Sequence, residues 1–191
     1  MSKSDSRERF IQSTALLLHE RGYSATSTGD IVAASGSPKG SLYFHFPGGK
    51  EELAALALSH AGKEVCEVIK HSLAPSRSVN QGLKEVFALF IAGLERSEFR
   101  AGCPVGTVAA EAPDSRLIAE AVATAFHQWH TLIKERLVQA GLPGHRADEL
   151  AEFILAAFEG GVLLAKATKG TKPLHTALRE ILHILQLENV R

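Results

Sequence analysis

Residues 26–50 read TSTGDIVAASGSPKGSLYFHFPGGK and contain the signals of two short helices. The first is expected to begin at Thr28, a favoured N-cap residue, and to end before Gly36. The second is expected to begin at Ser37-Pro38, an N-cap followed by proline at the first helical position, and to reach about Phe44. The stretch therefore predicts a pair of short helices joined by a tight turn.

The rest of the chain shows helical periodicity almost throughout, and no segment alternates polar and apolar residues over a useful length. A first helix is expected over about residues 6–21, and a short helix of small residues is expected to end before Pro113. We therefore predict an all-α fold, with an N-terminal domain over residues 1–50 and a helical-bundle domain over residues 51–191. Longer amphipathic helices are expected around residues 53–73, 83–94, 117–137, 150–165 and 174–185.

The composition is that of an ordinary globular protein, because 45% of the 191 residues are apolar and 21 Lys and Arg balance 21 Asp and Glu. The longest apolar runs, such as residues 153–158, have six residues, whereas a membrane-spanning helix needs ~20. The polar N-terminal residues predict no secretion signal, so a cytoplasmic location is expected. Cys66 and Cys103 have no pairing framework and are expected to be reduced thiols.

Charge is unevenly distributed, because residues 1–50 hold six Lys and Arg against four Asp and Glu. Residues 36–50 contain no carboxylate, so a surface that faces anions is expected there. Two short helices with a tight turn match a helix-turn-helix, whose second helix fits the major groove of DNA. The same spacing also fits a small helical packing unit with no role in DNA binding.

If the pair of helices binds DNA, its residues divide into two groups. Lys39 and Ser41, at the start of the second helix, are placed to meet base edges, and Gly40 lets the backbone approach the DNA. The other candidates would contact phosphates, and they are Thr28, Tyr43, His45 and Lys50.

About the first 55 residues carry a long motif made of Arg7, Ile11, Gly22-Tyr23, Thr26-Ser27, Asp30-Ile31, Gly36, Lys39-Gly40-Ser41-Leu42-Tyr43, His45-Phe46 and Lys50-Glu51-Glu52-Leu53. This motif resembles the tetracycline-repressor-like (TetR) family of bacterial transcription regulators. The resemblance implies the same DNA-facing residues, and a small core in which Leu42, Phe44 and Phe46 pack alongside Ile31 and Leu17.

The loop from Phe46 to Lys50 departs from the common family pattern, because it contains a proline and an extra glycine. The phosphate contact that the resemblance implies for Lys50 is therefore less secure than the others. Together with Gly102-Cys103-Pro104, the loop is similar to the branch of repressors that govern multidrug efflux genes in response to lincomycin- or flavonoid-like compounds.

Aromatic residues in the C-terminal two-thirds lie on helix faces that must turn inward, where they can fill a core or line a pocket. Cys103, at a helix start, is expected to be either a buried small apolar residue or an oxidant-sensitive thiol. His130 and Glu159 are the ionisable residues expected nearest the pocket wall, where one of them could orient an aromatic effector. The resemblance implies an effector pocket with the candidate residues Phe87, Phe90, Cys103, Phe126, Trp129, His130, Phe158 and Glu159.

Two residue pairs have the spacing of metal ligands on one helix face: His127 with His130, and Glu180 with His183. Neither pair has further ligands at matching spacing, so we expect no metal site. The sequence contains no glycine-rich phosphate loop, nucleophile elbow or catalytic triad pattern, so no enzyme activity and no cofactor are expected. A helical-bundle enzyme or metal carrier that uses these four residues is the rival hypothesis.

The last two helices predict a homodimer, because small residues let a second helix approach closely and leucines supply an apolar seam. Gly161 could instead be an internal packing contact. The predicted function is a homodimeric repressor that binds double-stranded operator DNA and is released by a small apolar or aromatic effector. A DNA-binding regulator without a ligand response is the alternative. The candidate dimer residues are Ala156, Ala157, Gly160, Gly161, Leu178, Ile181, Leu182 and Leu185.

Overall fold

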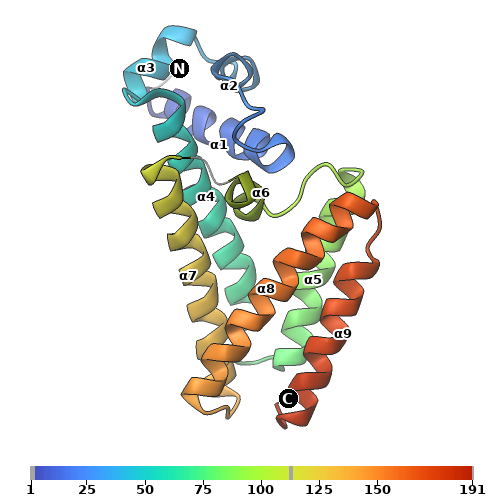
Figure 1. Cartoon of the computed structure of the whole chain (residues 1–191). Helices are drawn as coiled ribbons and strands as arrows, with labels where there is room; N and C mark the ends of the chain where they lie inside the picture. Colours follow the sequence, from blue (N-terminus) through green and yellow to red (C-terminus); the bar gives the residue numbers. More distant parts are fainter. Residues whose placement is uncertain (1–2, 112–113, 191) are drawn as a thin grey trace. The chain divides into compact units, whose positions relative to one another are not determined.

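A computed structural model describes residues 3–111 and 114–190 of the chain (Figure 1). Within these residues every regular element is a helix, so the predicted all-α fold is confirmed. The helices are α1 (Lys3–Arg21), α2 (Thr28–Ser35), α3 (Lys39–His45), α4 (Gly49–Ser72), α5 (Val79–Arg96), α6 (Pro104–Glu111), α7 (Arg116–Gln139), α8 (Gly144–Thr168) and α9 (Lys172–Leu187).

The start of α2 differs by one residue from the prediction. Ser27 is the N-cap, because its backbone is extended (φ −92°, ψ 161°) and Thr28 is already helical. Ser27 Oγ accepts a hydrogen bond from the Asp30 N–H at 3.1 Å, and the Asp30 carboxylate accepts one from the Ser27 N–H at 2.9 Å. This reciprocal capping box begins the helix, and Gly36 ends it in the left-handed conformation at φ 60°.

The start of α3 is also shifted by one residue from the prediction. Pro38 is the N-cap instead of the first helical residue, because its ψ of 136° is extended. Ser37 therefore lies in the turn, where it is buried and donates its N–H to Ser35 Oγ at 3.2 Å. The helix then runs one residue beyond Phe44, to His45.

The helices group into two compact units. One unit contains residues up to 64 together with residues 103–126, and the other contains residues 65–102 together with residues 127–191. Both α4 and α7 contribute residues to each unit. The units therefore do not coincide with the predicted division after residue 50, which stays a prediction about function.

The core of the first unit holds α2 and α3 against α1. The rings of Phe10 and Phe46 meet edge to face, with centroids 6.0 Å apart. Phe44 is a correction to the expected core, because its side chain is 66% exposed. It stands about 200° around the helix from the buried Leu42, at 100° per residue, and so points to the opposite side. The core residues are Phe10, Ile11, Leu17, Ile31, Leu42, Phe46 and Leu53.

The second unit packs α5 and α8 against α9. The ring of Phe158 meets Phe87 and Phe90 edge to face, at centroid distances of 5.1 and 4.8 Å. Trp129 is also buried, with 2% of its surface exposed. These aromatic residues form part of the core of the second unit.

Candidate DNA-binding site and ligand pocket

The outer face of α3 is open to solvent. Lys39 and Gly40 are exposed in its first turn, and a Cβ added at Gly40 would meet no atom within 4 Å. Tyr43 is 54% exposed and Phe44 is 66% exposed. Ser41 is half-buried, and its Oγ donates to the Pro38 carbonyl at 2.7 Å. The face thus presents one cation and two aromatic rings around a glycine that allows close approach.

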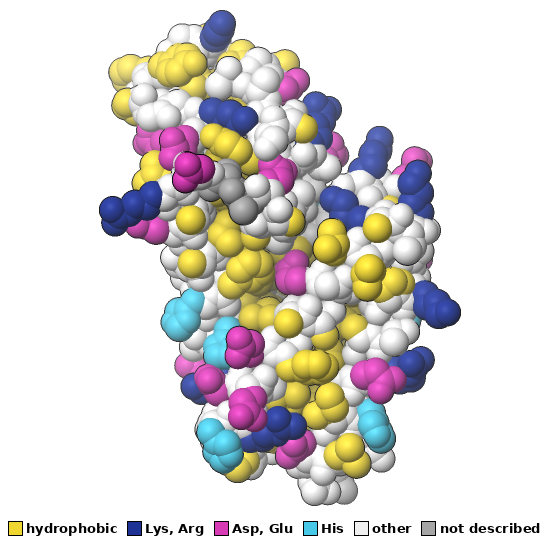
Figure 2. All heavy atoms as spheres, viewed as in Figure 1, with side chains coloured by type: hydrophobic (Ala, Val, Ile, Leu, Met, Phe, Trp, Pro, Cys, Tyr) yellow, Lys and Arg dark blue, Asp and Glu magenta, His cyan; other side chains and the backbone are white. Residues whose placement is uncertain are grey.

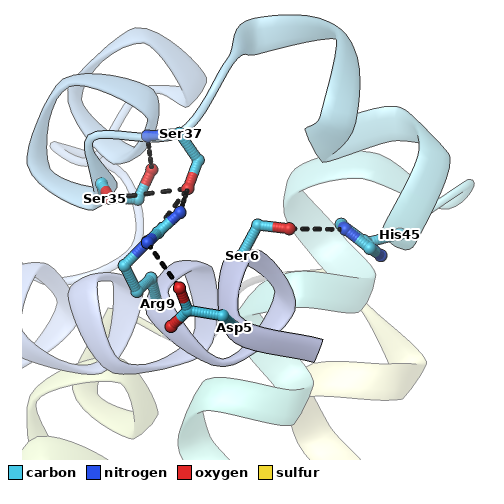
Figure 3. Close-up of polar contacts among 6 residues, drawn as sticks. All are labelled: Asp5, Ser6, Arg9, Ser35, Ser37 and His45. Carbon is cyan, nitrogen blue, oxygen red and sulfur yellow. Dashed lines mark hydrogen bonds and ion pairs between the residues drawn. The ribbon is translucent and has the colours of Figure 1, made fainter. Parts of the chain in front are cut away.

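The other side of the α2–α3 turn is fixed by α1 (Figure 3). Arg9 Nη2 donates to Ser37 Oγ at 3.1 Å, and Arg9 Nη1 lies 3.0 Å from the carboxylate of Asp5. At the end of α3, Nε2 of His45 lies 2.9 Å from Oγ of Ser6. A phosphate contact by His45 would therefore use its other ring nitrogen, while the Ser6 contact fixes the ring.

Lys50 is half-buried and lies against the first unit's own surface. Its Nζ is 4.0 Å from the centroid of the Tyr23 ring, in a cation–π contact. Burial lowers the pKa of the Lys50 ammonium, and the negative charge of Glu111 opposes that shift. In this conformation Lys50 is engaged within the unit, and a phosphate contact would require it to leave the ring.

A contact that the sequence did not predict ties α6 to the loop between α1 and α2. The carboxylate of Glu111 accepts hydrogen bonds from the N–H groups of Tyr23 at 2.9 Å and Ser24 at 2.7 Å. Gly22, at φ 77°, makes room for this contact, because a Cβ there would lie 1.5 Å from Glu111 Oε1. Glu51 of α4 accepts a hydrogen bond from Ser115, so a second carboxylate ties the segment after α6 to the same unit.

Four of the predicted effector residues come together in the second unit. Phe87, Phe90, Trp129 and Phe158 line an apolar pocket with residues from α4, α5, α7 and α8. Its volume is about 30 Å³, which is the space one water molecule occupies in the liquid. The aromatic residues therefore form both the wall of a small cavity and most of the core around it.

The other four predicted effector residues lie elsewhere. Cys103 and Phe126 belong to the first compact unit. Cys103 is 1% exposed, and its Sγ accepts from the Gly106 N–H at 3.3 Å, as expected of a buried small residue at a helix start. Nε2 of His130 lies 3.2 Å from the Asp148 carbonyl oxygen instead of lining the pocket. Glu159 is half-buried on α8 and does not line the pocket either.

The predicted dimer residues of α9 require a correction. Ile181 and Leu185 have no exposed surface, because they pack into the chain's own core. Gly161 is also internal, since a Cβ there would lie 3.0 Å from Leu174. Leu178 and Leu182 are half-buried beside α5. Ile181, Leu185 and Gly161 are therefore internal, whereas the dimer role of Leu178 and Leu182 stays a prediction.

An apolar surface on α8 includes the predicted Gly160 together with positions that were not predicted. Phe153 is 45% exposed and Leu164 is 55% exposed, and a Cβ added at Gly160 between them would meet no atom within 4 Å. Leu187, near the end of α9, is 69% exposed. Figure 2 shows hydrophobic side chains on the face where α8 and α9 lie side by side.

Two negative findings apply to the described part of the chain. Among residues 3–111 and 114–190, no three His, Cys, Asp or Glu side chains come together as metal ligands. In the same residues, no helix combines the length and apolar composition that crossing a membrane requires.

In the described residues, a helix-turn-helix packs on α1 and its second helix has an open face, which is the arrangement of DNA-binding transcriptional regulators. Comparison with known families agrees. Residues 10–57 match the model described as bacterial regulatory proteins of the tetR family. Residues 80–180 match the model of the LmrA/YxaF-like transcriptional regulator C-terminal domain. The chain belongs to the TetR family of transcriptional regulators.

Individual relatives span nearly the whole chain. LmrA of Bacillus subtilis, an HTH-type transcriptional regulator, is 35% identical over 91% of this chain and 93% of its own length. YxaF of the same organism is 34% identical over 91% of each chain. A regulatory protein TetR from Rhodobacter sphaeroides has a similar fold, with a TM-score of 0.84 and 24% identity over 92% of this chain and 96% of its own. These relatives are transcriptional regulators and not enzymes.

Proposed function

We propose that this regulator is a homodimeric repressor that leaves its operator when a small apolar or aromatic molecule binds. A role on operator DNA would place it in the bacterial cytoplasm. The observation that carries the DNA-binding part is the open face of α3, where Lys39 and Gly40 are followed by the exposed Tyr43 and Phe44. Phe44 joins the proposed contacts because its exposure makes it available to a thymine methyl group or a sugar.

The other DNA contacts are proposed by position. Lys39 and Ser41 would read base edges, since they stand in the first turn of α3. Thr28, at the first residue of α2, would contact a phosphate together with Tyr43. His45 and Lys50 are proposed as further phosphate contacts. His45 would use the ring nitrogen that does not face Ser6, and Lys50 would first leave the Tyr23 ring.

The effector is proposed to enter the apolar pocket of the second unit. A pocket of about 30 Å³ is far below the roughly 300–1,000 Å³ of ordinary ligand sites, so a ligand must displace side chains. Among the four aromatic residues of the pocket, Phe90 is the most able to move, because it is half-buried whereas the other three are buried. A ligand that favours the displaced arrangement would lower the affinity for DNA. By linkage, DNA would lower the affinity for the ligand by the same coupling free energy.

The homodimer is proposed to form through the exposed face of α8, with Leu187 of α9 beside it. Phe153, Gly160 and Leu164 recur at intervals of seven and four residues, which keeps them on one side of the helix. A two-fold axis would set this face against its own copy, and Gly160 would allow the two helices to approach closely.

Selection of bound duplexes from a random DNA library tests the central proposal. The selected duplex should bind the full chain with two half-sites, and affinity should fall steeply with salt, at a log–log slope of about −0.9 per neutralised phosphate. Failure to enrich any sequence would overturn the proposed operator binding. Candidate aromatic effectors can then be titrated, with Trp129 emission reporting the pocket and release of the duplex reporting the coupling.

A further inference from the structure

A groove lies between α5 and α9, and it takes part in neither the α3 face nor the apolar pocket. Figure 1 shows the two helices. Its volume is about 760 Å³, within the roughly 300–1,000 Å³ typical of small-molecule sites. All of its lining residues belong to the second compact unit. The groove is therefore a candidate ligand-binding site that is large enough for a small molecule, whereas the pocket of about 30 Å³ is not.

The charged side chains in the groove are all basic. Lys84 comes from α5, and Arg179 comes from α9 with His175 and His183 one turn before and one turn after it. No carboxylate lines the groove. Two acidic neighbours are paired outside the groove, Glu85 with Arg77 and Glu188 with Arg146. Glu180 pairs with Arg179 itself, so a bound anion would share that guanidinium with Glu180, whereas Lys84 faces the groove from α5. The groove therefore favours an anion.

The floor of the groove is apolar. Leu178 and Leu182 are half-buried and lie one turn apart on α9, next to the basic row. Val190, which follows α9, is 2% exposed and completes the floor. An apolar floor beside a basic row fits a molecule with a hydrocarbon body and an acidic head, because burial of the body adds to the attraction of the charges.

The α5 wall adds an unsatisfied hydrogen-bond acceptor. Oδ1 of Asn80 is buried and has no hydrogen-bond partner, although Asn80 lines the groove. An unpaired buried acceptor is costly, so a ligand that donates a hydrogen bond to Oδ1, once the Asn80 amide has turned toward the groove, gains free energy. Asn80 stands one helical turn from Lys84, so the donor would lie close to the acidic head of a ligand bound at that lysine.

We propose that the α5–α9 groove binds an aliphatic carboxylate that carries a hydroxyl group near its carboxyl end. The carboxylate binds Lys84 and Arg179, the hydroxyl donates to Asn80 Oδ1, and the hydrocarbon chain covers Leu178 and Leu182. The site is distinct from the apolar pocket, so the chain has room for two classes of small molecule.

Isothermal titration calorimetry of the full-length chain with 3-hydroxydecanoate tests the site. We expect saturable binding of one molecule per chain, at least tenfold weaker binding of 3-hydroxybutyrate, and weaker binding of decanoate. The double variant Lys84→Gln/Arg179→Gln should bind 3-hydroxydecanoate at least tenfold less tightly, since each lost charge-assisted contact is worth roughly tenfold. Arg96→Gln, an exposed arginine of α5 outside the groove, is the matched control and should bind as the wild type does.

Asn80→Ala separates the hydroxyl contact from the charge contact. It should remove the preference for 3-hydroxydecanoate over decanoate and leave decanoate affinity unchanged. The proposal is overturned if millimolar 3-hydroxydecanoate does not bind, if the double variant binds as the wild type does, or if Arg96→Gln loses as much affinity as the double variant. Quenching of Trp129 that survives in the double variant would place the molecule in the apolar pocket and would also overturn the proposal. Saturable binding of an acidic peptide, without binding of 3-hydroxydecanoate, would likewise overturn the proposal.

Discussion

Lys39 is the residue for which base reading is proposed most directly, since its ammonium is exposed in the first turn of α3. Lys39→Ala should lower affinity for the selected operator by about 1–3 kcal/mol and lower affinity for unrelated duplexes much less. Fluorescence anisotropy with both duplexes measures the ratio. Lys172→Ala, an exposed lysine at the start of α9, is the control and should leave the ratio unchanged. Equal losses on both duplexes would make Lys39 a phosphate contact.

Phe44 and Phe46 are two residues apart, yet the structure gives them opposite roles. Phe44→Ala should weaken operator binding and leave the urea denaturation midpoint nearly unchanged, because the ring is 66% exposed. Phe46→Ala should destabilise the chain by about 3–5 kcal/mol, because its fully buried ring packs against Phe10. A large loss of stability in Phe44→Ala would contradict the exposed position.

Among the elements, α2 offers a direct test of its corrected start. Ser27→Ala should lower the free energy of unfolding by about 1 kcal/mol, whereas Thr28→Ala should have a smaller effect. The hydrogen bonds from Ser27 lower the pKa of the Asp30 carboxyl. The contribution of the capping box is therefore complete above the ordinary Asp pKa and is lost as the pH falls through the lowered one. Urea titrations of both variants at neutral and acidic pH check the assignment; a larger loss in Thr28→Ala would contradict it.

The contact between α6 and the α1–α2 loop depends on one carboxylate. Glu111→Gln keeps one oxygen acceptor but presents an amide N–H₂ to the second backbone N–H, so one of the two hydrogen bonds is lost. We expect faster hydrogen exchange at Tyr23 and Ser24 and several-fold weaker operator binding, with the chain still folded. Glu95→Gln, at an exposed position of α5, is the control. Unchanged exchange at both amides would show that the contact does not hold the loop.

The elements that the sequence predicted well are those with local signals. The turn at Gly36, the proline before α3 and the apolar spacing of Phe10 and Ile31 place the helix-turn-helix to within a residue or two. The Glu111 contact could not be found in this way, because 88 residues separate its carboxylate from Tyr23 and no local pattern marks it.

At the scale of the whole molecule, the helical periodicity of the sequence did not show which apolar residues face a second copy of the chain. Ile181 and Leu185 repeat at helical spacing and are fully buried within the chain, whereas Leu187 on the same helix is 69% exposed. Leu187 stands about 200° around the helix from Leu185, at 100° per residue, so the two lie on opposite sides of α9. The packing of α9 against α5 and α8 decides which of these sides is buried. For the same reason the sequence located four pocket residues but could not show how far their rings fill the space.

The proposed dimer makes a prediction that separates assembly from folding. Wild-type protein at micromolar concentration should sediment at about twice the chain mass of 20.5 kDa. Leu164→Glu should give a folded monomer, because this side chain is 55% exposed in the single chain and would carry its charge into the interface only in the dimer. Val138→Glu, at an exposed apolar position on α7 in the same compact unit, is the matched control and should remain dimeric. A Leu164→Glu monomer can contact only one half-site of the operator, so it should also lose most of its operator affinity. A monomeric wild type, or a Leu164→Glu variant that still sediments as a dimer, would contradict the α8 interface.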